Sequence, residues 1–110
     1  SVLDQRDQLK RESVQMYHAM LQRAWIDGPP TRDARIMLDV AKSSLGLDDA
    51  DCANVEGQAQ IEAYRDAVST ALSTGRVSRD DAAALDDIRE RYQVRPSDQD
   101  EILRSLPSSR

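Results

Sequence analysis

The chain has 110 residues, a length that suits one domain able to bury roughly two thirds of its unfolded surface. Its net charge of −5 argues against a nucleic-acid interface, because such surfaces are basic. The single cysteine excludes an internal disulfide, and no apolar run is long enough to insert into a membrane. Four glycines and four prolines are too few turn signals for a β-sandwich. We therefore expect an all-α protein, located in the cytoplasm.

The chain begins with a stretch, Ser1–Ser13, that is helical in composition but poor in large apolar residues. We expect it to extend the first helix beyond the core, either as a solvated arm or as a lead-in to a coiled coil. A heptad counted from Leu3 places Asp7 and Lys10 at the apolar core positions of the coiled coil, which argues against it. Leu3 and Leu9 are candidates for contact with a partner.

Apolar residues from Val14 to Trp25 recur at helical spacing and predict the first core helix. Gly28 ends it, and Pro29 and Pro30 prevent its continuation. Thr31 is suited to cap the next helix. The predicted apolar stripe of that helix consists of Ile36, Met37, Val40, Ala41 and Leu45, and Gly46 ends it.

Asp48 or Asp49 is expected to cap a long helix that continues to Thr74, with Gly57 as a weak point. The alternative is a kink at Gly57 between two helices. Gly75 closes this helix in either case. Two more helices are predicted, the first starting at Ser78 with Asp81 in a variant capping box, the second at Ser97 with Asp100.

A shift of 47 residues aligns the two halves of the chain. The shift pairs apolar, turn and cap positions, among them Tyr17 with Tyr64, Gly28 with Gly75, Asp33 with Asp80 and Leu38 with Leu85. We predict a compact all-α bundle of about five helices, made of two tandem helix-turn-helix units with a long N-terminal helix. The expected parts are an arm at 1–13, units at 14–56 and 57–106, and a tail at 107–110.

Five aspartates are candidates for binding a divalent cation: Asp27, Asp33, Asp48, Asp49 and Asp51. The turn that follows Asp27 lacks the alternating oxygen ligands and the bidentate acid of a calcium loop. Acidic residues at helix starts also offset the positive end of the helix dipole. We therefore expect caps and solvated faces, with no metal and no cofactor.

The chain offers little for catalysis. His18 and Cys52 are its only histidine and cysteine, and their spacing matches no triad or metal motif. Phosphate-binding glycine loops and the H-E-x-x-H motif are absent from the sequence. We expect no enzymatic activity.

Trp25 pairs with Leu72 under the 47-residue shift, which predicts a core position with its indole N–H on a turn carbonyl. An exposed Trp25 would instead anchor a partner, as would the turn at Pro29 and Pro30. A pocket lined by Met16, Met20, Met37 and Trp25 would mark a small-ligand site, although methionines at helical spacing more often fill a core.

The segment from Ala24 to Asp33, followed by Leu38 and Leu45-Gly46-Leu47, resembles the repeated unit of tellurite-resistance TerB-like helical domains. The segment from Ala71 to Val94 is similar. The resemblance implies an all-helical intracellular domain in stress-response or membrane-linked assemblies, some of which bind divalent cations. Thr74 stands where the first unit has Asp27, and Asp33 replaces the usual Glu, so no metal ligands are transferred to this chain.

The leading hypothesis is a non-enzymatic interaction or assembly module of a larger protein, which contacts a protein partner or a second copy of itself. A cation-responsive TerB-like domain and a small-ligand sensor are the alternatives.

Overall fold

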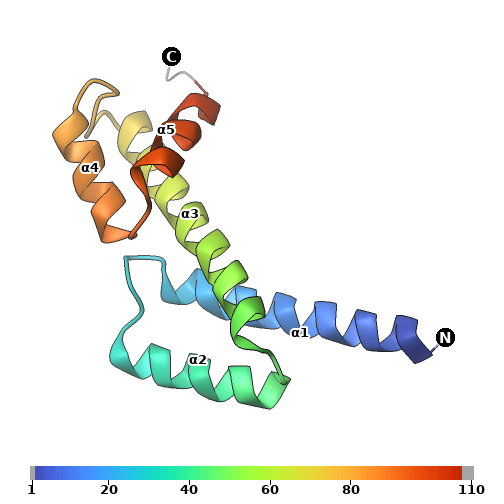
Figure 1. Ribbon diagram of the computed structural model, residues 1–110. Coiled ribbons are helices and arrows are strands. Elements are labelled where there is room, and N and C mark those ends of the chain that lie inside the picture. Colours follow the sequence, from blue (N-terminus) through green and yellow to red (C-terminus); the bar gives the residue numbers. More distant parts are fainter. Residues whose placement is uncertain (1, 108–110) are drawn as a thin grey trace.

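The computed structural model describes residues 2–107, apart from the side chain of Leu3. This part of the chain forms five helices and no strands, which confirms the all-α prediction (Figure 1). None of the five is both long and apolar enough to cross a membrane. The helices are α1 (Val2–Ala24), α2 (Arg32–Leu45), α3 (Asp49–Ser73), α4 (Ala82–Arg91) and α5 (Pro96–Ser105). Ser1, the Leu3 side chain and residues 108–110 of the expected tail lie outside the described residues.

Helix α3 is the axis of the molecule (Figure 1). Helices α1 and α2 lie at its N-terminal half, while α4 and α5 lie at its C-terminal half. The boundary expected after residue 56 falls inside α3, so both units share this helix. The first half of α1 projects from the bundle, as expected for the arm, and the molecule measures 52 × 33 × 22 Å.

One continuous apolar core joins the two halves. Core positions 47 residues apart are buried in pairs. The pairs are Tyr17 and Tyr64, Leu21 and Val68, Leu38 and Leu85, Leu47 and Val94, and Val55 and Ile102. The apolar pairing seen in the sequence therefore coincides with burial.

The ends of α2 and α4 have the same geometry. Gly46 ends α2 in the left-handed region at φ 68°, and the Leu47 N–H donates to the Lys42 carbonyl at 3.0 Å. Gln93 follows α4 at φ 56°, and the Val94 N–H donates to the Arg89 carbonyl at 3.1 Å. These are the hydrogen bonds of a Schellman motif, placed 47 residues apart.

Several predicted caps are confirmed. Thr31 accepts from the Ala34 N–H at 3.1 Å, and Asp48 accepts from the Asp51 N–H at 2.8 Å. Helix α3 runs without interruption through Gly57, as the favoured interpretation required.

Two predicted caps are wrong. Residues 78–81 form a turn, in which the Asp81 N–H donates to the Ser78 carbonyl, so Asp81 rather than Ser78 caps α4. Helix α5 begins one residue before the predicted cap Ser97, because Pro96 suits the first helical position. No side chain caps α5, and Asp98 pairs with Arg95 at 3.1 Å.

The predicted apolar stripe of α2 is also partly wrong. Ile36, Met37 and Val40 are 53–64% exposed, and Leu38 is the fully buried residue of the helix. Only a narrow strip of α2, which includes Leu38, Ala41 and Leu45, packs against the core. The fold therefore leaves three large apolar side chains of α2 in solvent.

Candidate interaction surface

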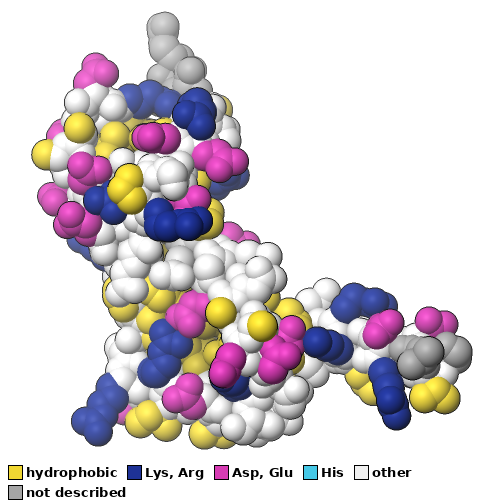
Figure 2. Space-filling view, in the orientation of Figure 1, with side chains coloured by type: hydrophobic (Ala, Val, Ile, Leu, Met, Phe, Trp, Pro, Cys, Tyr) yellow, Lys and Arg dark blue, Asp and Glu magenta, His cyan; other side chains and the backbone are white. Residues whose placement is uncertain are grey.

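The first unit contains a partly buried polar cluster centred on Glu56 of α3. Its carboxylate accepts two hydrogen bonds from the Arg35 guanidinium, at 3.1 and 2.7 Å, and one from Trp25 Nε1 at 2.9 Å. Trp25 is 2% exposed, so the core prediction is confirmed and its alternative role as a partner anchor is wrong. Its N–H binds this carboxylate rather than the expected turn carbonyl. In Figure 2, acidic and basic side chains lie together over apolar surface between α2 and α3.

The cluster shifts the ionisation of its members. Burial raises the pKa of Glu56, but the hydrogen bonds from Arg35 and Trp25 outweigh it and hold the pKa below its ordinary value. Burial, followed by the neighbouring Cys52, raises the pKa of Tyr17 to about 12. The ionised Glu56 is therefore the form that the fold stabilises.

Most of the candidate cation ligands occupy structural positions. Asp48 is the cap of α3, Asp49 pairs with Lys42, and Asp51 pairs with Lys10 at 3.4 Å. Asp33 lies in the first turn of α2 and is exposed. Within residues 2–107, no three acidic, histidine or cysteine side chains gather as a metal site would require. His18, 2.8 Å from the Glu62 carboxylate, and the buried Cys52 belong to no such group.

The large apolar side chains that the fold leaves in solvent belong to one half of the molecule. Seven of those described are more than half exposed, and every one lies between residues 2 and 40. They are Val2, Leu9 and Met16 on α1, Ile26 in the turn after it, and Ile36, Met37 and Val40 on α2. Figure 2 shows such side chains projecting from the lower edge of the molecule, where α2 lies in Figure 1.

The second half provides an internal comparison for these positions. The residues 47 further along are Asp49, Glu56, Ala63, Ser73, Ala83, Ala84 and Asp87, all of them small or polar. Five of the seven, Ala63, Ser73, Ala83, Ala84 and Asp87, lie in the second unit, which thus forms the same helix-turn-helix arrangement without large apolar side chains at these places. The fold does not require them in the first unit.

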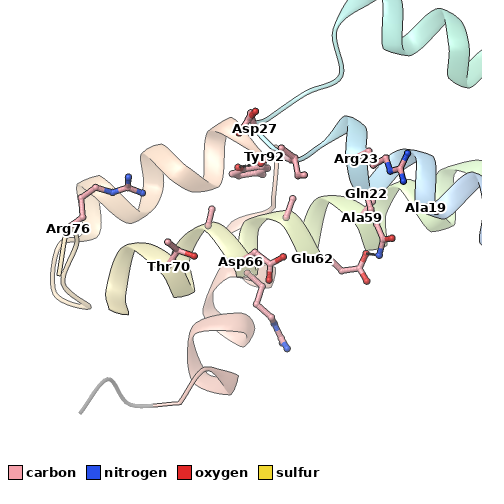
Figure 3. Close-up of a pocket in the computed structure, with 14 residues that line it drawn as sticks. Ala19, Gln22, Arg23, Asp27, Ala59, Glu62, Asp66, Thr70, Arg76 and Tyr92 are labelled. Carbon is pink, nitrogen blue, oxygen red and sulfur yellow. Dashed lines mark hydrogen bonds between the residues drawn. The ribbon is translucent and has the colours of Figure 1, made fainter. Parts of the chain in front are cut away.

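A groove of about 870 Å³ lies where the two halves meet (Figure 3). Its floor is formed by small residues of α3, notably Ala59, Ala63 and Ala67. One wall is the end of α1 with Ala19, Arg23 and Ile26. Tyr92 lies beside the same wall, where its hydroxyl donates to the Ile26 carbonyl at 2.9 Å.

The rim of the groove carries both charges. The lining contains three arginines and three acidic residues, which are Arg23, Arg65, Arg76, Asp27, Glu62 and Asp66. The groove therefore combines small side chains of α3 with balanced positive and negative charges. These properties suit a helix of mixed charge better than an anion or a cation.

The structure separates several residues that the sequence singled out together. Leu9 and Pro29 are exposed, Pro30 is half-buried, and Leu9 lies far along the projecting arm. Met16 and Met37 are exposed on different helices, while Trp25 is buried, so the pocket that would have marked a small-ligand site does not form.

Sequence reasoning missed Ile36, Met37, Val40, Met16 and Ile26 as surface candidates. The available signal was the comparison of the two units, which shows apolar residues in one copy only.

Comparison with known proteins finds no matching family model and no match among curated proteins or solved structures.

Proposed function

We propose that the chain is a non-enzymatic protein-interaction module whose first unit contacts other protein surfaces. In this proposal the two units are copies of one helix-turn-helix repeat. The second copy completes the shared core, and the first has acquired a binding face. The observation that carries the proposal is the confinement of exposed large apolar side chains to residues 2–40.

The contrast between the copies supports a binding role over chance exposure. Positions that the core needs are apolar and buried in both units, as with Leu38 and Leu85. Positions that the core does not need carry large apolar side chains only in the first unit, as with Met37 against Ala84. Contiguous exposed apolar residues lower solubility, and in natural proteins they often mark contact sites.

The central element of this face is the patch formed by Ile36, Met37 and Val40. Residues three and four apart are neighbours on a helix, so these three side chains form one apolar area. The acidic neighbours Asp33 and Asp39 are exposed next to it. An apolar centre with a polar rim is the usual anatomy of a protein interface. The resemblance to TerB-like domains and a cytoplasmic setting are part of the same proposal.

Site-specific photo-crosslinking tests the proposal. A photoreactive amino acid is placed at Met37 in one variant and at Ala84 in the other, in cells that produce the chain. Both positions lie outside the core, so both variants are expected to fold. We expect a discrete protein adduct from position 37 and none from position 84. Equal adducts from both positions, or none from position 37, would contradict a binding face on the first unit.

A further inference from the structure

The exposed apolar residues of α1 lie on one face of that helix. Val2, Leu9 and Met16 are seven residues apart, a spacing that keeps side chains together with a drift of about 20° per step. Ala19, three residues beyond Met16, continues the same face, and Ile26 follows it in the turn after α1. We name this face the α1 seam. It lies opposite Tyr17 and Leu21, which face the core.

The α1 seam and the groove are adjacent. Ala19, Arg23 and Ile26 belong to the seam and also form the groove wall beside the small residues of α3. At the other end of the helix, the first half of α1 projects away from the bundle (Figure 1), and its Val2 and Leu9 are 66% and 63% exposed. Each molecule therefore carries a helical arm with apolar side chains and, elsewhere, a groove of a size to hold a helix.

We propose that two copies of the chain form an antiparallel dimer in which each copy's arm occupies the other's groove. The inference rests on the proposed function for the assignment of the exposed residues of the first unit to binding. The groove extends along α3 from Ala59 to Thr70, about 17 Å at 1.5 Å per residue. The arm from Val2 to Glu12 is about as long, so one arm fills one groove.

One antiparallel register pairs the α1 seam from Leu9 to Ile26. An antiparallel pair with its two-fold axis level with Tyr17 and His18 sets Glu12 of each copy opposite Arg23 of the other. The same axis sets Leu9 on Ile26 and the large Met16 on the small Ala19. Opposite charges and complementary sizes thus meet at every level from 9 to 26.

The charges of the α1 seam are available for this pairing. Among residues 2–107, the Arg23 side chain has no hydrogen-bond or ion-pair partner, while its backbone carbonyl accepts from the Ile26 N–H. Glu12 is exposed and is held only by Gln8 of its own helix, at 3.0 Å. A parallel pair would set Arg23 on Arg23 and Glu12 on Glu12, and like charges in register disfavour it. Arg23 and Glu12 therefore select the antiparallel orientation.

Charge reversal tests the dimer by sedimentation equilibrium from low micromolar to millimolar protein. The wild type is expected to dimerise reversibly. Glu12→Arg and Arg23→Glu each create two like-charge pairs, and each should weaken association at least about tenfold. The double variant exchanges the two charges and should restore it. Asp7→Arg, a reversal on another face of the arm, is the matched control and should leave association unchanged.

Cysteine crosslinking tests the register. In a Cys52→Ser background checked for folding by circular dichroism, Leu9→Cys combined with Ile26→Cys should give a covalent dimer on mild oxidation. These positions are about 25 Å apart along α1 and the turn that follows it, so a bond between them must join two copies. Leu9→Cys alone should stay monomeric under the same conditions, because the register also holds the two copies of Leu9 about 25 Å apart.

A strict monomer at every concentration would overturn the dimer. The proposed register would also be overturned if both charge-reversal variants associated as strongly as the wild type and no crosslink formed through positions 9 and 26. A monomer that still gives the adduct at Met37 would refute this dimer and leave the interaction module standing. A monomer that also gives no adduct at Met37 would refute both the dimer and the interaction module.

Discussion

Glu56 shows how one residue distinguishes the two units. In the first, its partly buried carboxylate joins the buried Trp25 to the partly exposed Arg35. Leu103 is the residue 47 positions further on, and the counterparts of Trp25 and Arg35 are Leu72 and Ala82. The second unit therefore fills the same place with apolar side chains. A charged cluster and an apolar one are both compatible with this fold, provided that every buried polar group has a partner.

Glu56→Gln is expected to lower the free energy of unfolding by about 1–3 kcal/mol at pH 7, because it removes the charge that Arg35 and Trp25 stabilise. The pKa of Glu56 is lower in the folded state than its ordinary value of 4.5. Its ionised form therefore contributes stability above that pH, and the contribution is lost as the pH falls through the folded pKa. The difference between wild type and variant should shrink in acid.

Urea denaturation at pH 7 and near pH 3 measures both effects. Glu101→Gln, at an exposed carboxylate of α5, is the control and should change stability little at either pH. A Glu56→Gln effect that is absent at pH 7, or that grows in acid, would show that the cluster does not stabilise the fold through charge.

At the scale of the element, Gly46 and Gln93 occupy equivalent helix ends with different side chains. Both have positive φ, a conformation that glycine adopts without cost and that other residues adopt at a cost of roughly 1 kcal/mol. The strain at Gln93 is tolerated because the same capping hydrogen bonds form at both ends.

Gln93→Gly is expected to raise the free energy of unfolding by about 0.5–1 kcal/mol, since it relieves the positive φ at an exposed position. Gly46→Ala should lower it by about 1 kcal/mol for the opposite reason. Thermal unfolding followed by circular dichroism gives both values. A destabilised Gln93→Gly variant would mean that the Gln93 side chain makes contacts that outweigh its backbone strain.

Elements of this protein were predictable where local chemistry decides them. Gly46 and Thr31 end and begin α2 through hydrogen bonds within a few residues, so the sequence alone located them. The start of α4 was not predictable in this way. Ser78 and Asp81 are both favourable N-cap residues. Because residues 78–81 form a turn, the helix starts after Asp81, which is therefore the cap.

At the scale of the whole molecule, the buried face of α1 and the shared core could be predicted from apolar periodicity. Apolar periodicity does not predict which apolar residues lie on the surface. Ile36, Met37 and Val40 have the spacing of a core stripe, yet α2 lies at the edge of the bundle, with only a narrow strip of its surface against the core. How many neighbours a helix has depends on the arrangement of all the helices, which no local pattern encodes.

The central claim is that these exposed apolar residues serve binding and not folding. Giving the first unit the residues of the second, in the triple variant Ile36→Ala, Met37→Ala and Val40→Asp, tests it without a known partner. Urea denaturation of the purified protein should place its unfolding free energy within about 1 kcal/mol of the wild type. Leu38→Ala, on the buried side of the same helix, should lose about 2–5 kcal/mol. A triple variant as unstable as Leu38→Ala would contradict the account, because the three side chains would then belong to the core.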